Sequence, residues 1–135
     1  MIELITELAV YEKAADQVVV TVKDLEQNGF GKNPIFNFFV AEYEGYIIGL
    51  ALYYIKYSTW KGRCIFLEDI IVTEKFRGKK VGAKLFEKII EVAKNEKVKR
   101  LEWQVLNWNE PALNFYKKYN AYLDSEWINA KLVFD

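Results

Sequence analysis

Residues 66–116 read FLEDIIVTEKFRGKKVGAKLFEKIIEVAKNEKVKRLEWQVLNWNEPALNFY, and the rest of the chain can be arranged around them. The apolar run FLEDIIV predicts a strand, which ends just before Arg77-Gly78 and a helix that opens near Val81-Gly82. A strand that runs into a glycine-bearing turn and then a helix leaves backbone N–H groups unpaired, and the positive end of the helix dipole adds to them. The pattern predicts a turn that binds phosphate groups. The alternative is a solvated basic helix start.

The same stretch predicts a parallel pair of strands. We expect one strand over residues 63–72, a helix from about Lys79 to Lys94 with its apolar residues on one face, and a second strand over residues 100–108. Two strands joined by a helix in this way lie parallel, through a right-handed crossover.

The segments before this stretch predict two helices and an antiparallel hairpin. Apolar residues at helical spacing indicate a helix over residues 2–12, and Thr21 can cap a second short helix over residues 22–29. Residues 35–43 and 46–57 are rich in aromatic and β-branched residues, and Glu44-Gly45 between them is typical of a hairpin turn. The sheet is therefore expected to be mixed and mostly antiparallel.

The last part of the chain predicts a helix and closing strands. A helix fits residues 109–119, with Asn109 as its cap and Pro111 in its first turn, and residues 121–134 resemble one or two strands. We expect one α/β domain over residues 1–135, since 52% hydrophobic residues suffice for a core at this length.

Composition excludes several classes of protein. Nineteen basic and nineteen acidic residues leave no net charge, so we expect no nucleic-acid partner. The longest apolar runs fall short of the ~20 residues that span a bilayer, so we expect no membrane partner. The N-terminus lacks a basic leader and Cys64 is the single cysteine. These features predict a cytoplasmic location and no internal disulfide.

The chain contains no histidine, which shortens the set of possible mechanisms. Ser-His and Cys-His nucleophile pairs and His-rich metal sites are excluded, and we expect no metal. A proton acceptor must be a carboxylate, an amine or water. Cys64 has no histidine to activate it, so we interpret it as a core residue.

Two adjacent acids, Glu68 and Asp69, interrupt the apolar strand. Strand alternation predicts that they point to opposite faces, and both cannot face a core without cost. At least one is expected to have a functional or hydrogen-bonded role. The alternative is a strand acid paired with Lys or Arg.

Several motifs in a fixed order carry a resemblance to a known family: LED at 67–69, RG-x-x-x-G at 77–82, WNEP at 108–111 and NFYKK at 114–118. Together with ITELAVYEKAADQVVVTVKDLEQNGFG and YYIKYSTWKG, they make the chain resemble the GNAT acetyltransferases. Within them it resembles the spermidine/spermine (diamine) acetyltransferases and their thialysine-acetylating relatives. The resemblance implies the GNAT fold, a mixed sheet with a parallel central strand pair flanked by helices. The chain begins inside what resembles the family's first helix, so the usual first strand is expected to be missing.

The resemblance also implies an activity. An acetyl group would pass from acetyl-CoA directly to a primary amine of a small polyamine in a ternary complex, and the enzyme would be a homodimer. The turn reads STW, and Ser58 stands where polyamine-specific members carry an acid, which leaves thialysine or another lysine-like amine as the alternative substrate. Lys80 occupies the usual middle glycine of the phosphate loop, so a catalytically degenerate CoA-binding dimer module is the alternative of another class. A positive φ at Lys80 would cost on the order of 1 kcal/mol.

The resemblance assigns roles to individual residues. Tyr116 is the expected acid, because a phenol with a pKa near ~10 keeps its proton and can share it with a thiolate, and Glu68 is the expected base through water. Periodicity alone would make Tyr116 a packing residue, and Trp60 could equally be a core tryptophan. The implied cofactor positions are Ile70, Ile71, Val72, Arg77, Gly78, Lys79, Lys80, Val81, Gly82, Ala83, Asn109, Ala112 and Tyr116. The implied amine positions are Tyr11, Glu12, Trp60, Glu68, Asp69 and Glu126.

Overall fold

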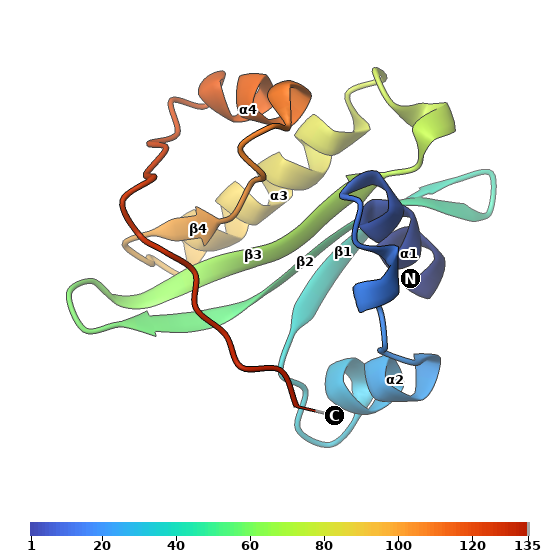
Figure 1. The fold of residues 1–135 in the computed structure, drawn as a ribbon, viewed down its shortest axis with the longest axis horizontal. Helices are drawn as coiled ribbons and strands as arrows, with labels where there is room; N and C mark the ends of the chain where they lie inside the picture. The colour runs from blue at the N-terminus through green and yellow to red at the C-terminus, as the bar shows by residue number, and fades with distance from the viewer. Residues whose placement is uncertain (135) are drawn as a thin grey trace. The chain divides into compact units, whose positions relative to one another are not determined.

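The computed structural model describes residues 1–134 (Figure 1). The described chain divides into two compact units, Met1–Gln104 and the residues from Val105 onward. The single domain predicted from the sequence stays a prediction. The elements in chain order are α1 (Ile2–Tyr11), the 3-10 turn η1 (Ala15–Gln17), α2 (Val22–Phe30), β1 (Asn37–Tyr43), β2 (Tyr46–Ser58), β3 (Gly62–Val72), the 3-10 turn η2 (Glu74–Phe76), α3 (Val81–Asn95), β4 (Leu101–Trp103) and α4 (Glu110–Lys117).

A mixed sheet of four strands forms the centre of the first unit, in the order β1-β2-β3-β4. The pairs β1–β2 and β2–β3 are antiparallel, while β3 and β4 are parallel. The predicted hairpin is confirmed, because Glu44 and Gly45 both have positive φ, at 49° and 83°, as a tight hairpin turn requires. The predicted mixed α/β architecture with one parallel pair is therefore correct.

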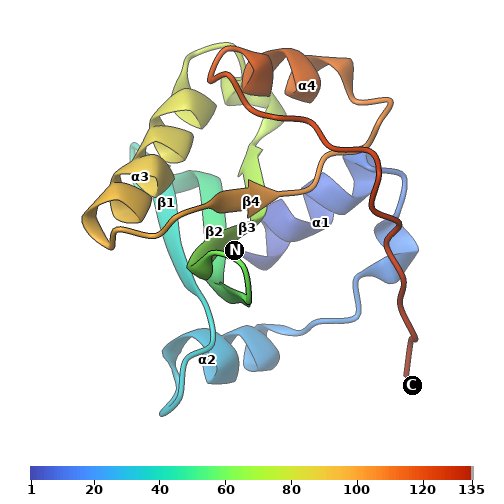
Figure 2. The same cartoon turned by 90° about the vertical axis from the view of Figure 1, so that its left-hand side faces the viewer.

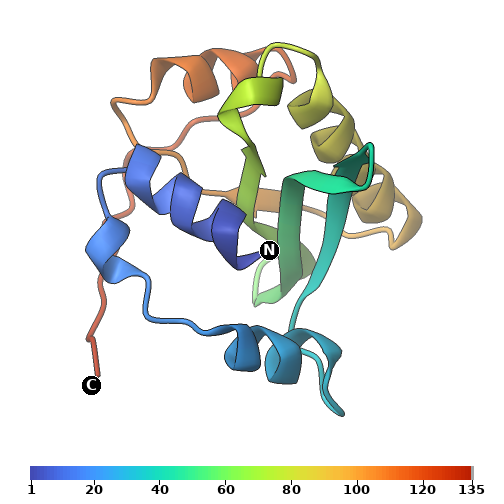
Figure 3. The ribbon, with the colours of Figure 1, turned by 90° about the vertical axis from the view of Figure 1, so that its right-hand side faces the viewer.

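Helices α1 and α3 cover opposite faces of this sheet (Figures 2 and 3). On one face, Leu4 of α1 packs with Leu50 and Ile71, which lie opposite each other on β2 and β3. On the other face α3 approaches Gly49 closely, since a Cβ atom added there would lie 3.0 Å from Leu85 Cδ1. The apolar stripe of α3 is thus buried as its periodicity predicts.

The predicted helices of the first unit are confirmed, with small shifts at their ends. Thr21 caps α2 through a capping box, in which Thr21 Oγ1 accepts the Asp24 N–H and the Asp24 carboxylate accepts the Thr21 N–H. Helix α3 begins at Val81, because Lys80 is in the left-handed region and ends the preceding turn. Within residues 1–134, none of the helices combines the length and the hydropathy that a membrane span requires.

Two strand predictions in the last third of the chain are wrong in extent or existence. The strand expected over residues 100–108 covers only Leu101–Trp103, and it pairs with residues 65–67 of β3. The closing strands expected over residues 121–134 are absent from the described chain, although apolar side chains such as Trp127 and Ile128 are exposed there. Strand-like composition fixes no hydrogen-bonding partner, and a strand exists only where the backbone finds one.

The second unit contains α4, which begins where the sequence predicts. The Asn109 side chain accepts the Ala112 N–H at 3.3 Å, and a proline occupies the first turn. This is the cap that the WNEP motif indicates.

Candidate active site

The predicted phosphate-binding turn has the backbone conformation of an anion cradle. After β3 ends at Val72, the turn contains two residues with positive φ, Gly78 at 78° and Lys80 at 63°. Turns that mix left-handed and right-handed residues point successive N–H groups toward one concave side. The turn therefore presents backbone donors, as the sequence predicts.

Lys80 occupies the left-handed conformation (φ 63°, ψ 16°) at the N-cap of α3. This conformation is expected to lower the stability of the folded protein by on the order of 1 kcal/mol relative to glycine at this position. Lys80 carries a positive charge, so an anion bound at this helix end would compensate part of this cost.

The first turn of α3 is suited to receive an anion. The N–H groups in the first turn of an α-helix have no intrahelical acceptors. In α3 no side chain caps them and the first turn has no acidic residue, so these donors and the positive end of the helix dipole suit an anion. An added Cβ at Gly82 would meet only Val72 Cγ2 within 4 Å, at 3.7 Å. Packing within the protein therefore does not demand glycine at this position.

One edge of β3 is open beside this turn. On the side away from β2, β4 pairs only with residues 65–67. Within the part of the chain that the structure describes, no strand pairs with residues 68–72 on that side. The open edge is the one on which the sequence-based prediction of strand addition depends.

A β-bulge at Glu68 corrects the predicted orientation of the two acids. Leu52 pairs with Asp69 and Tyr53 pairs with Leu67, so Glu68 is an extra residue in β3. The Tyr54 hydroxyl donates to Glu68 Oε2 at 3.2 Å, and Tyr54 shares a face of β2 with Leu52. Glu68 and Asp69 thus lie on the same face of the sheet. The prediction of opposite faces is wrong because it assumed unbroken alternation.

This face also carries α1, and Glu12 at the end of α1 joins the two strand acids. Burial, and after it the negative charges of Glu68 and Glu12, together raise the pKa of Asp69 to about 6. Burial also raises the pKa of Glu12. Glu12, Glu68 and Asp69 form what we call the carboxylate cluster. Its charges repel one another, so it favours a cation.

Tyr54 completes the cluster as a hydrogen-bond donor. Burial, the charge of Glu68 and the hydrogen bond to Glu68 raise the pKa of Tyr54 to about 12. The hydroxyl therefore keeps its proton and holds the Glu68 carboxylate in place. Within residues 1–134, no group of three or more acidic or cysteine side chains is arranged to hold a metal ion.

Arg77, one of the implied cofactor positions, contacts other residues of the first unit with its side chain. Its Nε donates to the Val72 carbonyl at 2.9 Å, its Nη2 lies 3.5 Å from Glu7 Oε1, and its Cζ lies 5.3 Å from the centre of the Tyr11 ring. Its own N–H donates to the Glu74 carbonyl at 3.2 Å. The backbone N–H and the Nε of Arg77 are therefore already used within the protein.

Trp60 lies far from the other predicted amine-binding residues of the first unit. It lies at the tip of the β2–β3 hairpin with 79% of its surface exposed, so the alternative of a core tryptophan is excluded. Figure 1 shows this turn at the end of the hairpin far from α1, and β3 separates Gly62 from Asp69 by roughly 20 Å. Ser58 Oγ accepts the N–H groups of Trp60 and Lys61, both at 3.1 Å, so Ser58 shapes the turn.

The remaining predicted site residues belong to the second unit. Tyr116 is buried on α4, with 5% of its surface exposed, and its ring lies 5.3 Å from that of Phe115. Asn109 and Ala112 form the helix cap described above. Glu126 lies in the extended tail, where its N–H donates to Asp124 Oδ1 at 2.9 Å.

The sequence-based reasoning missed Tyr54 and Glu7. Tyr54 could have been found by counting along the hairpin from its turn, since Tyr54 pairs with Phe66 and is thus a diagonal neighbour of position 68. Glu7 carried no such signal, because its partners lie 66 and 67 residues further along the chain.

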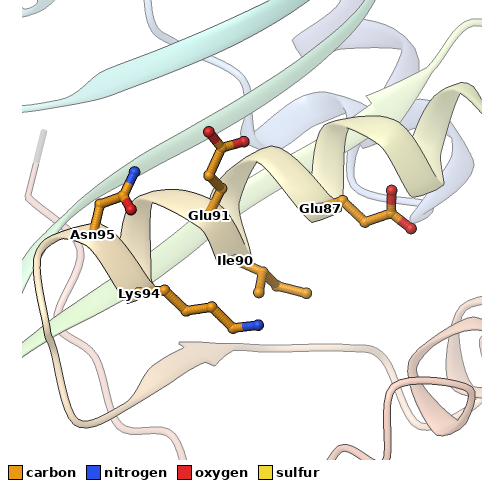
Figure 4. Close-up of a pocket in the computed structure, with 5 residues that line it drawn as sticks. All are labelled: Glu87, Ile90, Glu91, Lys94 and Asn95. Atoms are coloured by element: carbon orange, nitrogen blue, oxygen red, sulfur yellow. The ribbon is translucent and has the colours of Figure 1, made fainter.

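A shallow hollow on α3 lies apart from these groups. It has a volume of about 330 Å³ and is lined by Glu87, Ile90, Glu91, Lys94 and Asn95 (Figure 4). None of these residues belongs to the predicted site, and their ordinary helix-surface chemistry offers no catalytic constellation.

Comparison with known proteins agrees with this geometry. Residues 5–122 match the Acetyltransferase (GNAT) family. The chain is 41% identical over 129 residues to a thialysine N-epsilon-acetyltransferase of Bos taurus, an alignment that covers 90% of this chain and 76% of the relative. It is 31% identical to the spermidine/spermine N(1)-acetyltransferase-like protein 1 of Homo sapiens, over 90% of this chain and 18% of that protein.

A solved structure has the same fold. An aminoglycoside acetyltransferase from an uncultured soil metagenomic sample superposes with a TM-score of 0.79 at 16% identity, over 99% of this chain and 88% of that one. The family match spans the open edge of β3, the phosphate turn and α4 alike. The chain therefore belongs to the GNAT family of acetyltransferases.

Proposed function

We propose that this acetyltransferase uses acetyl-CoA to acetylate the side-chain amine of a small lysine-like substrate of the thialysine type. The observation that supports a cationic amine as the acceptor is the carboxylate cluster, since the bulge in β3 places Glu68 and Asp69 on one face beside the open edge of that strand and Glu12 lies near them. A cation would be held there next to the acyl donor. The 41% identity to a thialysine N-epsilon-acetyltransferase supports the choice of amine.

Residues of β3 and α3 fit the acyl donor. Acetyl-CoA supplies an acetyl thioester activated for transfer to an amine. The open edge at residues 68–72 suits a pantetheine arm aligned as an added strand. Since Arg77 already occupies the Val72 carbonyl, Ile70 and Ile71 are the better candidates for this role. The first turn of α3 and residues 78–83 suit the pyrophosphate.

The carboxylate cluster would bind the amine as an ammonium ion and then help to remove its proton. We propose Glu68 as the base through a water molecule, held by its hydrogen bond from Tyr54. Asp69 and Glu12 would anchor the positive charge, because a cation offsets the charges of Glu68 and Glu12 that add to burial in raising the pKa of Asp69. Tyr11, beside Glu12, would line the same side. Amine binding by Trp60 and Glu126 stays a prediction, since none of the distances or contacts described above supports it.

Tyr116 is the proposed acid for the leaving thiolate. A phenol with a pKa near ~10 keeps its proton at neutral pH and can share it with a thiolate of pKa near ~8.5. We expect Tyr116→Phe to lower kcat by about 100-fold while the Kd for acetyl-CoA changes little, because the ring is kept and only the hydroxyl is lost. Steady-state kinetics measures kcat, and calorimetry measures the Kd for acetyl-CoA. An unchanged kcat would return Tyr116 to a packing role.

A polyamine is the second candidate substrate. Three carboxylates close together, at Glu12, Glu68 and Asp69, match a polycation better than an amino acid that carries a carboxylate of its own. The 31% identity to the spermidine/spermine acetyltransferase-like protein agrees with this candidate. Ser58 argues against it, because its hydroxyl is used within the hairpin turn and adds no negative charge.

A panel of amines separates the candidates. The purified protein is incubated with acetyl-CoA and thialysine, lysine, putrescine, spermidine or spermine, and free thiol is followed. We expect kcat/KM for thialysine to exceed that for each polyamine by at least about tenfold. A preference for spermidine or spermine would favour the second candidate. If no amine releases thiol above background, the proposed function is wrong, and tight acetyl-CoA binding by calorimetry would then support a CoA-binding module.

A further inference from the structure

Glu7 of α1 joins this helix to the residues that follow β3. Its Oε1 accepts the Glu74 N–H at 2.9 Å, and its two carboxylate oxygens lie 3.3 and 3.0 Å from Thr73 Oγ1, which donates to them. Glu7 is separated from these partners by 66 and 67 residues. One carboxylate therefore fixes the position of α1 relative to the start of the phosphate turn.

Arg77 makes the second half of the same connection. Its guanidinium reaches Glu7 Oε1 through Nη2 at 3.5 Å, the Val72 carbonyl through Nε at 2.9 Å and the face of Tyr11 at 5.3 Å. The side chains of Arg77 and Glu7 are 40% and 32% exposed. An ion pair this exposed contributes little by itself, so the hydrogen bonds and the stacking on Tyr11 determine the geometry.

The two ends of this connection serve different ligands. The residues that directly follow Arg77, 78–83, suit the phosphates. Tyr11 and Glu12, at the C-terminal end of the helix that contains Glu7, suit the amine. We propose that Glu7 and Arg77 are positioning residues that couple acetyl-CoA binding to the placement of Tyr11 and Glu12. Neither side chain touches the reacting atoms. The proposal rests on the proposed function for the identity of the two ligands.

Kinetics with two acyl donors tests the coupling, because acetyl-CoA carries the pyrophosphate and S-acetylpantetheine does not. We expect Glu7→Ala and Arg77→Lys to raise the KM for thialysine about fivefold or more with acetyl-CoA and by less with S-acetylpantetheine, while kcat falls less. Arg77→Lys keeps the charge but loses the Nε hydrogen bond and the planar stacking. Glu7→Gln, which keeps an acceptor oxygen for the Glu74 N–H, should have a smaller effect.

Two kinetic outcomes overturn the proposal. One is an unchanged KM for thialysine in both Glu7→Ala and Arg77→Lys. The other is an effect of Arg77→Lys with acetyl-CoA that Glu7→Ala does not share, since that marks a direct phosphate contact of Arg77. Glu3→Gln, on the exposed side of the same helix, is the matched control and should leave both KM values unchanged. If Glu7→Ala fails to fold, Glu7→Gln and Arg77→Lys carry the test.

Hydrogen exchange gives a readout that needs no turnover. Saturating acetyl-CoA should slow exchange of the α1 amides and of the Glu74 N–H in the wild-type protein, and Glu7→Ala should abolish the slowing in α1 while acetyl-CoA stays bound. Bound acetyl-CoA with no effect on α1 overturns the coupling. If α1 is protected but none of the amines is acetylated, the coupling stands and the proposed function is wrong.

Discussion

The left-handed conformation of Lys80 is expected to reduce the stability of the protein. Its φ of 63° lies in the left-handed region, which is strained for a residue with a Cβ atom, and Lys80 is the N-cap of the helix proposed for the phosphates. We expect Lys80→Gly to raise the free energy of unfolding by roughly 0.5–1 kcal/mol, the relief of strain being partly offset by the greater entropy of unfolded glycine. Urea unfolding measures the change.

Lys79→Gly is the matched control for this prediction. Lys79 adjoins Lys80 but is not among the residues with positive φ, so glycine there should lower stability. The same Lys80→Gly variant should bind acetyl-CoA more weakly, because it loses a cation near the phosphates. Equal effects of the two glycine substitutions on stability would contradict the strain at Lys80.

Asp69 makes a second prediction at this scale, about pH. Burial, together with the negative charges of Glu68 and Glu12, raises its pKa from an ordinary value of 3.8 to about 6. The folded state therefore holds a proton between pH 4 and 6 that the unfolded state has released. Stability falls as pH rises through this window, and the penalty persists above pH 6.

Asp69→Asn should remove that penalty. We expect it to raise the free energy of unfolding by about 1–2 kcal/mol at pH 8 and by little at pH 4, as measured by urea unfolding at both pH values. The same variant should lose activity, since the charge that would hold the amine is gone. A gain of stability that is equal at pH 4 and pH 8 would rule out titration of Asp69 as its cause.

Among the elements, α3 contains the position where stability and ligand binding are expected to diverge. An added Cβ at Gly82 meets only Val72 Cγ2, at 3.7 Å, and alanine is a better helix former than glycine by up to about 1 kcal/mol. Gly82→Ala should therefore stabilise the protein by roughly 0.5 kcal/mol while it weakens acetyl-CoA binding, because the methyl group stands where the phosphates approach. Thermal unfolding and calorimetry measure the two effects. Unchanged acetyl-CoA affinity would place the phosphates elsewhere.

Local sequence signals were sufficient for most helices and for the first hairpin. Thr21 and Asn109 act as caps at the predicted positions, and Glu44-Gly45 makes the predicted turn. These features depend on the chemistry of neighbouring residues, which the sequence displays directly. Residues 77–80 likewise form the predicted turn before the helix that begins at Val81, because glycine and the helix start are local features.

Long-range pairing was not predictable in the same way. The extra residue at Glu68 depends on the register between β2 and β3, which no single strand specifies. Residues 105–108 and the tail have strand-like composition but form no strand in the described chain, because pairing needs a partner edge. The connection from Glu7 to Thr73 and Glu74 spans most of the first unit, and no local pattern marks it.

For the whole molecule, the exposed apolar side chains of the tail support the homodimer that the resemblance implies. Tyr122, Trp127, Ile128 and Phe134 are each more than 70% exposed, and such side chains are commonly covered in an interface. We propose a homodimer, which sedimentation equilibrium should detect as a species of twice the chain mass. A monomer at micromolar concentration would contradict it.

In the proposed reaction, the amine binds as an ammonium ion at the carboxylate cluster and loses its proton there. It then receives the acetyl group from acetyl-CoA, which binds at the open edge of β3 and the phosphate turn. Mass spectrometry of the acetylated amine, formed from acetyl-CoA and thialysine by the wild-type protein and by the double variant Glu68→Gln, Asp69→Asn, tests this most directly. We expect product in step with free CoA for the wild-type protein, and a rate lower by at least about 100-fold for the double variant. No acetylated amine from the wild-type protein, or an equal rate from the double variant, would contradict it.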